Sequence, residues 1–249
     1  MKLNDKEKDR YARQIVLSSI GLHGQQKIKN ARIFVIGAGG LGSTLLLYLT
    51  AAGVGKITII DGDNVQLNNL QRQVIFNQND IGINKVEAAK IKLKALNENI
   101  EINIINQFVT IENIQNILAP NSIIADCSDN FKTRYLVNDF AVANNCVLVS
   151  ASVYKHQLQF GVFNFPFKSN VRSATYRCAF PEENFEEIQD SCAQTGVLGV
   201  VPGIGGLLMA NEIIKIVTNA NDVQYNKLHT LDLQNLSLKQ WNIKRNKDI

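Results

Sequence analysis

The 249-residue sequence has little of several features that define common protein classes. It contains only four cysteines, at 127, 146, 178 and 192, and their spacing is unpaired, which favours a reducing compartment over a disulfide framework. No apolar run reaches the roughly 20 residues of a membrane span. The N-terminus, MKLNDKEKDR, carries acidic and basic residues and lacks the apolar segment of a secretion signal. We therefore expect a cytoplasmic protein with no membrane partner.

The charge balance is also small. Lysine and arginine total 26 and aspartate and glutamate total 22, so the net charge is +4 and dispersed. A balance this mild argues against nucleic acid as the main partner. What the chain does contain is 45% hydrophobic and 19% charged residues, together with 16 glycines and only four prolines. This composition supports a sizeable folded core and excludes global disorder.

Short apolar runs rich in β-branched residues alternate with helical stretches through residue 150. Such alternation predicts an α/β fold in which a parallel sheet is covered on both faces by helices. The expected strands are 31–36, 57–60, 101–105, 122–127 and 147–150. The expected helices are 6–19, 23–29, 41–52, 85–96, 111–118, 131–143 and, after a second glycine-rich segment, 207–217.

The pattern changes after residue 150. Alternating apolar and polar residues at 157–165, 227–233 and 236–241 predict antiparallel strands appended to the sheet. The polar stretch 167–193 lacks periodicity and is interpreted as a functional or mobile loop. We predict one Rossmann-like, doubly wound domain over 1–249, with N-terminal helices in 1–30, a nucleotide-binding part in 31–150 and an antiparallel extension in 151–249.

A glycine-rich turn follows the first expected strand. Gly37, Gly39 and Gly42 form the pattern GxGxxG, with Gly40 between them, at the start of a helix whose free amides can bind phosphate. Asp61 ends the next strand, where a carboxylate can accept hydrogen bonds from ribose hydroxyls. The alternative is that the glycines only allow close packing of helix on strand. The pattern alone most often indicates a dinucleotide, so an NAD-dependent oxidoreductase stays open.

Polar and basic residues follow Asp61. Asn69, Arg72 and Gln73 lie within DGDNVQLNNLQRQ, and Lys85 comes shortly after it. Cations that converge near phosphates suit phosphoryl or nucleotidyl transfer, in which charge develops on phosphate oxygens, and have no role in hydride transfer. The alternative for Arg72 and Lys85 is an ordinary solvated helix face.

A second polar group, residues 126–130 (DCSDN), ends another parallel strand at the same edge. Open α/β sheets bind ligands at the carboxyl edge of their strands. A carboxylate here, Asp129, can hold Mg²⁺ on the departing pyrophosphate. The alternative is that Asp129 caps the helix that begins near Phe131.

Over nearly its full length the chain resembles the adenylyltransferases typified by ThiF, MoeB and HesA, bacterial relatives of the ubiquitin-activating enzymes. The resemblance rests on seven motifs in the family's order: RYARQI (10–15), GAGGLGS (37–43), DGDNVQLNNLQRQ (61–73), GINKVEAA (82–89), DCSDN (126–130), YRCAFP (176–181) and GVLGVVPGIG (196–205).

The resemblance implies that ATP adenylylates the C-terminal glycine carboxylate of a small ubiquitin-fold sulfur-carrier protein and that pyrophosphate is released. It places Asn69, Arg72 and Lys85 at the reacting phosphates and Asp129 on Mg²⁺. It also implies a homodimer in which Arg13 reaches the γ-phosphate of the partner subunit, although Arg13 can equally be a rim residue of the first helix. The nucleotide contacts that it implies are Gly37, Gly39, Gly40, Gly42, Asp61, Asn68, Asn69, Gln73 and Asn130.

The chain departs from the family's pattern at the zinc site. Family members commonly hold a structural zinc on two CxxC pairs, but here the first pair reads Thr175 to Cys178 and no cysteine follows Trp241. Because one cysteine does not make a four-ligand site, we predict no zinc and a tail held by packing alone. Cys192 matches a family cysteine that in some members attacks the adenylate or forms an acyl-persulfide, and an ordinary loop thiol is the alternative.

Few residues distinguish the thiamin branch of the family from the molybdopterin branch. The segment 150–152 (SAS) followed by QLQFGVF resembles ThiF more than MoeB, which favours a ThiS-like carrier of the thiamin thiazole pathway over a MoaD-like carrier of the molybdopterin pathway. A sulfur donor such as a cysteine desulfurase is a further expected partner. Besides the oxidoreductase, a non-catalytic carrier-binding module is a third class left open.

Overall fold

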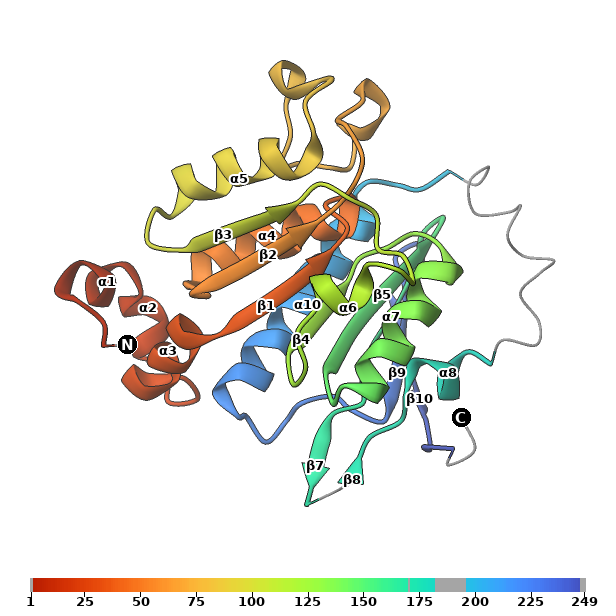
Figure 1. The fold of residues 1–249 in the computed structure, drawn as a ribbon. Helices are drawn as coiled ribbons and strands as arrows, with labels where there is room; N and C mark the ends of the chain where they lie inside the picture. Colours follow the sequence, from red (N-terminus) through yellow and green to blue (C-terminus); the bar gives the residue numbers. More distant parts are fainter. Residues whose placement is uncertain (1, 170, 182–195, 247–249) are drawn as a thin grey trace.

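The computed structural model describes residues 2–169, 171–181 and 196–246. Its centre is an eight-stranded sheet in the order β10-β9-β6-β5-β4-β1-β2-β3 (Figure 1). The parallel strands are β1 (Arg32–Ile36), β2 (Lys56–Ile60), β3 (Glu101–Ile105), β4 (Ile123–Asp126) and β5 (Val147–Tyr154). Beyond β5 follow β6 (Gln157–Phe163), β9 (Lys227–Asp232) and β10 (Ser237–Asn242), each antiparallel to the strand before it in the sheet. The predicted fold class, a mostly parallel sheet with an antiparallel extension, is confirmed.

Helices cover both faces of this sheet (Figure 1). On one face lie α4 (Gly40–Ala52), α5 (Lys85–Leu96) and α10 (Val200–Thr218), and on the other lie α6 (Ile114–Ile117) and α7 (Phe131–Ala143). The N-terminal helices are α1 (Asp5–Arg10), α2 (Ala12–Ile15) and α3 (Gly21–Asn30), and two single 3₁₀ turns occupy Leu67–Asn69 and Gln78–Asp80.

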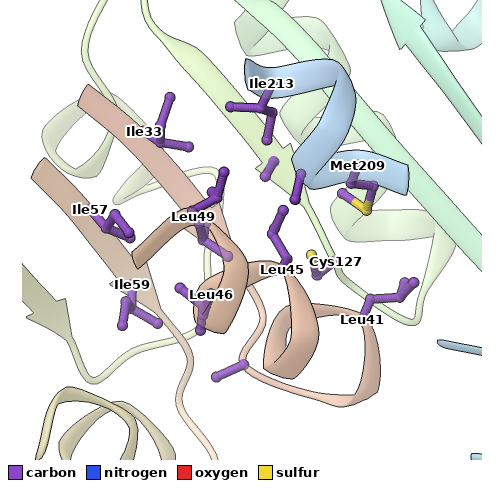
Figure 2. Close-up of a cluster of buried hydrophobic side chains, with 14 of the residues drawn as sticks. Ile33, Leu41, Leu45, Leu46, Leu49, Ile57, Ile59, Cys127, Met209 and Ile213 are labelled. Carbon is purple, nitrogen blue, oxygen red and sulfur yellow. The ribbon is translucent and has the colours of Figure 1, made fainter. Parts of the chain in front are cut away.

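The main core lies between the sheet and α4. Leu45, Leu46 and Leu49 of α4 are fully buried and face Ile33 of β1 and Ile57 of β2 (Figure 2). Alternate residues of each strand face this cluster, whereas the residues between them face the smaller cluster under α7. Because α4 packs tightly on the sheet, its N-terminus is fixed at the carboxyl edge of the parallel strands.

The predicted helix 6–19 is wrong. The helix breaks at Tyr11, which is 3% exposed and turns inward so that its hydroxyl accepts a hydrogen bond from Asn97 Nδ2 at 2.9 Å. The Tyr11 ring lies against Gly53, where a Cβ would approach the ring to 2.5 Å. This contact fastens the N-terminal helices to the C-terminal end of α4, because Gly53 is the residue that ends that helix.

The last long helix begins at Val200 rather than at 207. Its first turn accommodates Pro202, whose missing N–H has no helical partner at that position. A Cβ at Gly206 would lie 2.2 Å from Thr44 Oγ1, so the glycines within α10 allow close approach to α4. By length and composition α10 is also a candidate membrane span. Its packing on α3, α4, β5 and β6 explains the apolar composition as burial.

Two further predictions need correction. The predicted helix 111–118 is limited to the four residues of α6. The predicted loop 167–193 contains regular structure in its first part, namely β7 (Pro166–Lys168), β8 (Val171–Arg172) and α8 (Tyr176–Ala179). The rest of that stretch, 182–195, lies outside the described residues.

Candidate functional site

In the glycine turn between β1 and α4, some glycines are required by backbone packing and others are not. Gly37 has φ +93°, and a Cβ there would lie 2.8 Å from Cys127 O. A Cβ at Gly42 would lie 2.1 Å from Gly37 O, so these two glycines are required by the turn itself. Gly39 and Gly40 have no such backbone contact and face side chains instead, including Pro202 of α10 opposite Gly40. The packing alternative therefore accounts for part of the motif only.

Besides Pro202, Arg72 and Gln73 of the segment after β2 face those two glycines. A Cβ built on Gly40 would lie 3.5 Å from Arg72 Cγ, and one on Gly39 would lie 3.7 Å from Gln73 Nε2. Gln73 is 3% exposed, and its Oε1 is buried with no hydrogen-bond partner among the described residues. A buried acceptor of this kind needs a donor from bound water or from a ligand.

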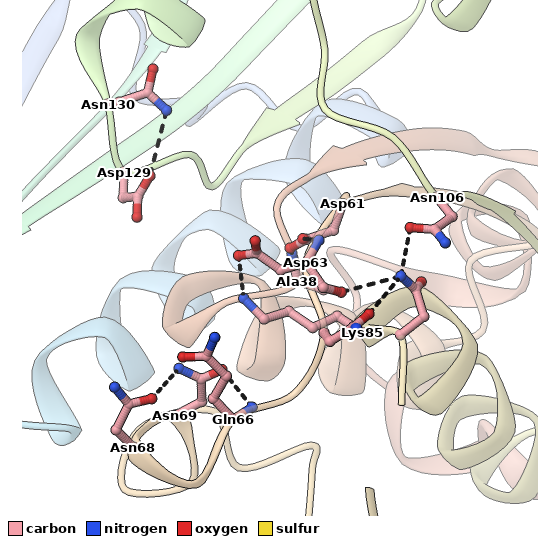
Figure 3. A network of polar contacts seen from close by, with 12 residues as sticks. Ala38, Asp61, Asp63, Gln66, Asn68, Asn69, Lys85, Asn106, Asp129 and Asn130 are labelled. Carbon is pink, nitrogen blue, oxygen red and sulfur yellow. Dashed lines mark hydrogen bonds and ion pairs between the residues drawn. The ribbon is translucent and has the colours of Figure 1, made fainter. Parts of the chain in front are cut away.

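The 3₁₀ turn before Arg72 orients this side of the site. Asn69 is buried; its Oδ1 accepts from Gln66 N and its Nδ2 donates to Asn68 Oδ1, each at 3.1 Å (Figure 3). Arg72 Nη1 donates to Asn68 O at 3.0 Å. Asn68, Asn69 and Arg72 are thus linked to one another by hydrogen bonds. The segment continues to Gln73, which lies beside Gly39 of the glycine turn.

Asp61 directly follows β2 and lies beside the glycine turn. Its Oδ2 accepts from Ala38 N at 2.8 Å and its Oδ1 from Asp63 N at 2.9 Å (Figure 3). Burial raises the pKa of Asp61, and the positive charge of Lys85 opposes that effect. The carboxylate is therefore held at the carboxyl edge, in the place predicted for a ribose acceptor.

Lys85 begins α5 and points into the same site. It is 5% exposed, and its Nζ lies 2.8 Å from Asp63 Oδ2 (Figure 3). The alternative of a solvated helix face is therefore wrong for Lys85. Asp63 was not singled out from the sequence, although the carboxylate-glycine-carboxylate pattern at 61–63 could have indicated it.

Asp129 and Asn130 lie across the edge from Lys85, after β4 (Figure 3). Asn130 caps α7, because its Oδ1 accepts from Thr133 N at 2.9 Å. The alternative role of Asp129 as the helix cap is therefore wrong. Asp129 is exposed. Among the described residues, its carboxylate accepts one hydrogen bond, from Asn130 Nδ2 at 3.5 Å. A single exposed carboxylate suits Mg²⁺, which commonly takes one or two protein carboxylates together with phosphate oxygens and water.

One predicted catalytic residue, Arg13, is not brought to this site within one protomer. Arg13 lies exposed on α2, next to Gln14, whose side chain donates to Ala52 O at the far end of α4. Since α4 is about 20 Å long and starts at the glycine turn, Arg13 is distant from the site within one protomer. Cys192 lies outside the described residues.

The residues present do not fit the family's zinc. The Cys178 sulfur lies 3.2 Å from Thr175 Oγ1 and accepts from Asn246 N at 3.4 Å, so the protein itself supplies its contacts. No group of three His, Cys, Asp or Glu side chains suited to a metal occurs among the described residues. The expectation of a tail held by packing alone is wrong, because Arg245 Nη1 donates to Asn164 Oδ1 and Ser173 O.

An open α/β sheet with a glycine turn, a ribose-type acid and two cations at its carboxyl edge defines a nucleotide-binding protein of the Rossmann-like class. The comparisons with known proteins give the particular family. The family model described as the ThiF family matches residues 11–249. The chain belongs to the ThiF family, and the enzyme class predicted from the sequence, an adenylyltransferase, is confirmed.

Three relatives illustrate the match. The chain is 38% identical to the sulfur carrier protein adenylyltransferase of Thermus thermophilus, over 99% of this chain and 91% of that protein. It is 34% identical to the SAMP-activating enzyme E1 of Haloferax volcanii, over 100% and 90%. It is 40% identical to the adenylyltransferase and sulfurtransferase MOCS3 of Culex quinquefasciatus, over 96% of this chain but only 54% of that protein. The chain thus spans about half the length of MOCS3.

Among solved structures, the fold is similar to that of E. coli MccB with ATP. The TM-score is 0.85 at 25% identity, and the alignment covers 98% of this chain and 73% of MccB. Another solved structure, SeMet PaaA, has a TM-score of 0.80 at 19% identity over 96% of this chain and 84% of PaaA, which supports the fold alone.

Proposed function

We propose that this chain uses ATP to adenylylate the C-terminal carboxylate of a small ubiquitin-fold sulfur-carrier protein. The observation that carries the proposal is the convergence of Arg72 and Lys85 on the glycine turn, where Arg72 lies against Gly40 and Lys85 is buried beside Asp61 and Asp63. Two cations at this place serve developing phosphate charge. The names of the Thermus and Haloferax relatives support a carrier protein as the substrate.

The reaction is a substitution at the α-phosphorus. A carboxylate oxygen of the carrier forms a bond to that phosphorus, the bond to the bridging oxygen breaks, and pyrophosphate leaves with the electron pair. The product is an acyl-adenylate, which is a far better acyl donor than the free carboxylate. Arg72 and Lys85 stabilise the charge on the phosphate oxygens, and the free amides of α4 contribute from the turn.

The remaining residues bind and orient. Asp61 accepts from the ribose hydroxyls, and the polar segment with Asn68, Asn69 and Gln73 lines the nucleotide. Asp129, with Asn130 beside it, would hold Mg²⁺, which would supply positive charge for the departing pyrophosphate. Hydride transfer would leave Arg72, Lys85 and Asp129 without a role.

We propose a homodimer in which Arg13 enters the site of the partner subunit. In support, Arg13 is exposed on α2, far from the glycine turn of its own chain. A second copy is the source that could bring this guanidinium to a γ-phosphate. Arg13→Ala is expected to lower activity while leaving ATP affinity of the separated monomer unchanged.

The carrier is proposed to be ThiS-like, with a MoaD-like carrier as the second candidate. The ThiF-like segment 150–152 lies in β5, with its first residue beside Asp126 of β4. The MOCS3 relatives join an adenylyltransferase to a sulfurtransferase in one chain, which supports a separate sulfur donor, such as a cysteine desulfurase, as a further partner here. Cys192 is retained as the proposed nucleophile that attacks the adenylate or forms an acyl-persulfide with the carrier.

The test is ATP–pyrophosphate exchange with a panel of small proteins that end in Gly-Gly. Exchange with one carrier and not with others identifies the partner, and exchange with none while the protein binds a carrier indicates a non-catalytic module. NAD in place of ATP, with hydride transfer as the readout, tests the oxidoreductase alternative. Cys192→Ala is expected to keep exchange and to lose only sulfur transfer.

A further inference from the structure

Two buried ionisable groups lie beneath the turn that carries Asp129. Asp126 ends β4 and is fully buried, and Arg134 on α7 is 7% exposed. Neither was among the predicted site residues. Removing such groups from water costs several kcal/mol per ion unless their partners compensate. Their contacts therefore indicate what they do.

Both groups hold Ser128. Asp126 Oδ1 accepts from Ser128 N at 3.0 Å, and Arg134 Nη2 donates to Ser128 O at 2.9 Å. Asp126 is itself fixed, because its Oδ2 accepts from Ser150 Oγ of the neighbouring strand at 3.1 Å. The amide and the carbonyl of one residue are thus held from opposite sides, by the sheet and by a helix.

The held carbonyl belongs to the peptide group that joins Ser128 to Asp129. On the other side of Asp129, the side chain of Asn130 is fixed by its bond from Thr133 N. Asp129 is exposed between these two fixed points. Few backbone torsions then remain at Asp129, so the point from which its side chain extends at the sheet edge is set by the buried Asp126 and Arg134.

The contrasting interpretation is a purely structural role for Arg134. Its guanidinium lies over the Phe131 ring at 5.4 Å, and Tyr176 of α8 is close to it. Burial raises the pKa of Tyr176 to about 12, so this neighbour stays neutral. The ring contact with Phe131 and the proximity of Tyr176 anchor α7. Neither involves the hydrogen bond from Arg134 to Ser128 O. Anchoring α7 does not by itself explain why Asp126 and Arg134 both form hydrogen bonds with the backbone of Ser128.

We propose that Asp126 and Arg134 are positioning residues that hold the Ser128–Asp129 peptide group so that Asp129 is presented to the nucleotide-bound metal. This inference rests on the proposed function, which assigns the metal to Asp129. Partners that orient a metal ligand typically change metal affinity by about ten- to a hundredfold when removed.

The test is a double-mutant cycle read by manganese binding. Mn²⁺ is titrated, with electron paramagnetic resonance as the readout, into protein that holds a non-hydrolysable ATP analogue. Arg134→Gln is expected to raise the Mn²⁺ dissociation constant about tenfold. The same substitution in an Asp129→Asn background is expected to add no further loss, because its effect passes through Asp129. Arg134→Lys should restore part of the affinity, since lysine can still donate to Ser128 O.

An unchanged Mn²⁺ affinity in Arg134→Gln, or an equal loss in the presence and absence of Asp129, overturns the positioning role. Wild-type protein that binds the analogue with no dependence on manganese contradicts instead the metal role of Asp129 in the proposed function, and the inference falls with it. If Arg134→Gln does not fold, Arg134→Lys replaces it in the cycle, with a smaller expected loss that again vanishes in Asp129→Asn.

Discussion

Lys85 Nζ lies 2.8 Å from Asp63 Oδ2, so the buried ammonium at the nucleotide site is held by a carboxylate from the loop after β2 (Figure 3). Asp63 is half-exposed while Lys85 is almost fully buried. A buried ammonium needs a partner, and Asp63 supplies one at a point from which the ammonium can turn toward a bound phosphate.

Lys85→Ala is expected to lower ATP–pyrophosphate exchange by about a hundredfold to a thousandfold, because a contact to developing phosphate charge is lost. Lys90→Ala on the same helix is the matched control and should retain exchange. Asp63→Asn should cost less than Lys85→Ala, since the ammonium remains. Equal activity of the Lys85 and Lys90 variants would remove Lys85 from the chemistry.

Arg72→Ala is expected to reduce exchange to a similar extent, because the proposed function assigns its guanidinium to the phosphate charge, and the Arg72 stem lies beside Gly40 at the turn. Arg72→Lys should recover little of it, since the planar, bidentate geometry of arginine is not reproduced. Steady-state exchange and circular dichroism of the three proteins test this. An Arg72→Ala protein that folds and retains full exchange contradicts the assignment.

The two kinds of glycine in the turn are expected to respond differently to alanine. Gly42→Ala places a Cβ 2.1 Å from Gly37 O, so the backbone must shift and stability should fall by about 1–3 kcal/mol. Gly40→Ala meets the Pro202 side chain at 3.0 Å and Arg72 at 3.5 Å. It should fold and lose ATP affinity mainly. Urea unfolding together with ATP titration separates the two effects, and the reverse pattern would contradict this division of roles.

Asp61 is expected to link stability to pH. Since burial raises its folded-state pKa, the folded protein keeps the proton to a higher pH than the unfolded chain does. Its contribution to stability is therefore present below the unfolded value near 3.8 and is lost as pH rises through the folded pKa. Asp61→Asn should flatten that part of the profile of melting temperature against pH, and a profile identical to wild type would refute the linkage.

The same substitution should weaken nucleotide binding. Losing a charged acceptor costs about 1.5–3 kcal/mol, which is about tenfold to a hundredfold in ATP affinity. Calorimetric titration of wild type and Asp61→Asn measures it. Unchanged affinity would place the ribose elsewhere.

The C-terminal tail is expected to be stable without metal. A zinc chelator should leave the melting temperature unchanged, and a metal assay should find no stoichiometric zinc. Arg245→Ala should lower stability by about 1–3 kcal/mol, because it leaves Ser173 O and Asn164 Oδ1 without this donor. Lys244→Ala is the neighbouring control. Chelator-induced melting would show that a metal holds the tail.

Periodicity predicts the central elements well. The strand 101–105 and the helices 85–96 and 131–143 have the bounds of β3, α5 and α7, because their apolar pattern and their packing agree. It fails where tertiary contacts override the local pattern, as at Tyr11, which breaks the first helix to reach Asn97. It also fails at Pro202, which reads as a loop residue but fits the first turn of α10.

The candidate site was predictable where a residue lies within a short motif. Asp61, Arg72 and Lys85 all follow the glycine turn within one strand-helix unit, so their order in the chain indicates their place. Arg134 and Arg245 were not predictable, because their partners at 128, 164 and 173 are set by the folded chain. A lone arginine in a helix or a tail carries no signal of such a contact.

The most direct test of the central claim is the intact mass of the carrier after incubation with this protein, ATP and Mg²⁺. The account predicts that the carrier gains one adenylyl group at its C-terminal glycine, with one pyrophosphate released for each carrier modified, and that Arg72→Ala abolishes the gain. A carrier of unchanged mass while ATP is cleaved to ADP, or preferential binding of NAD over ATP, would contradict it.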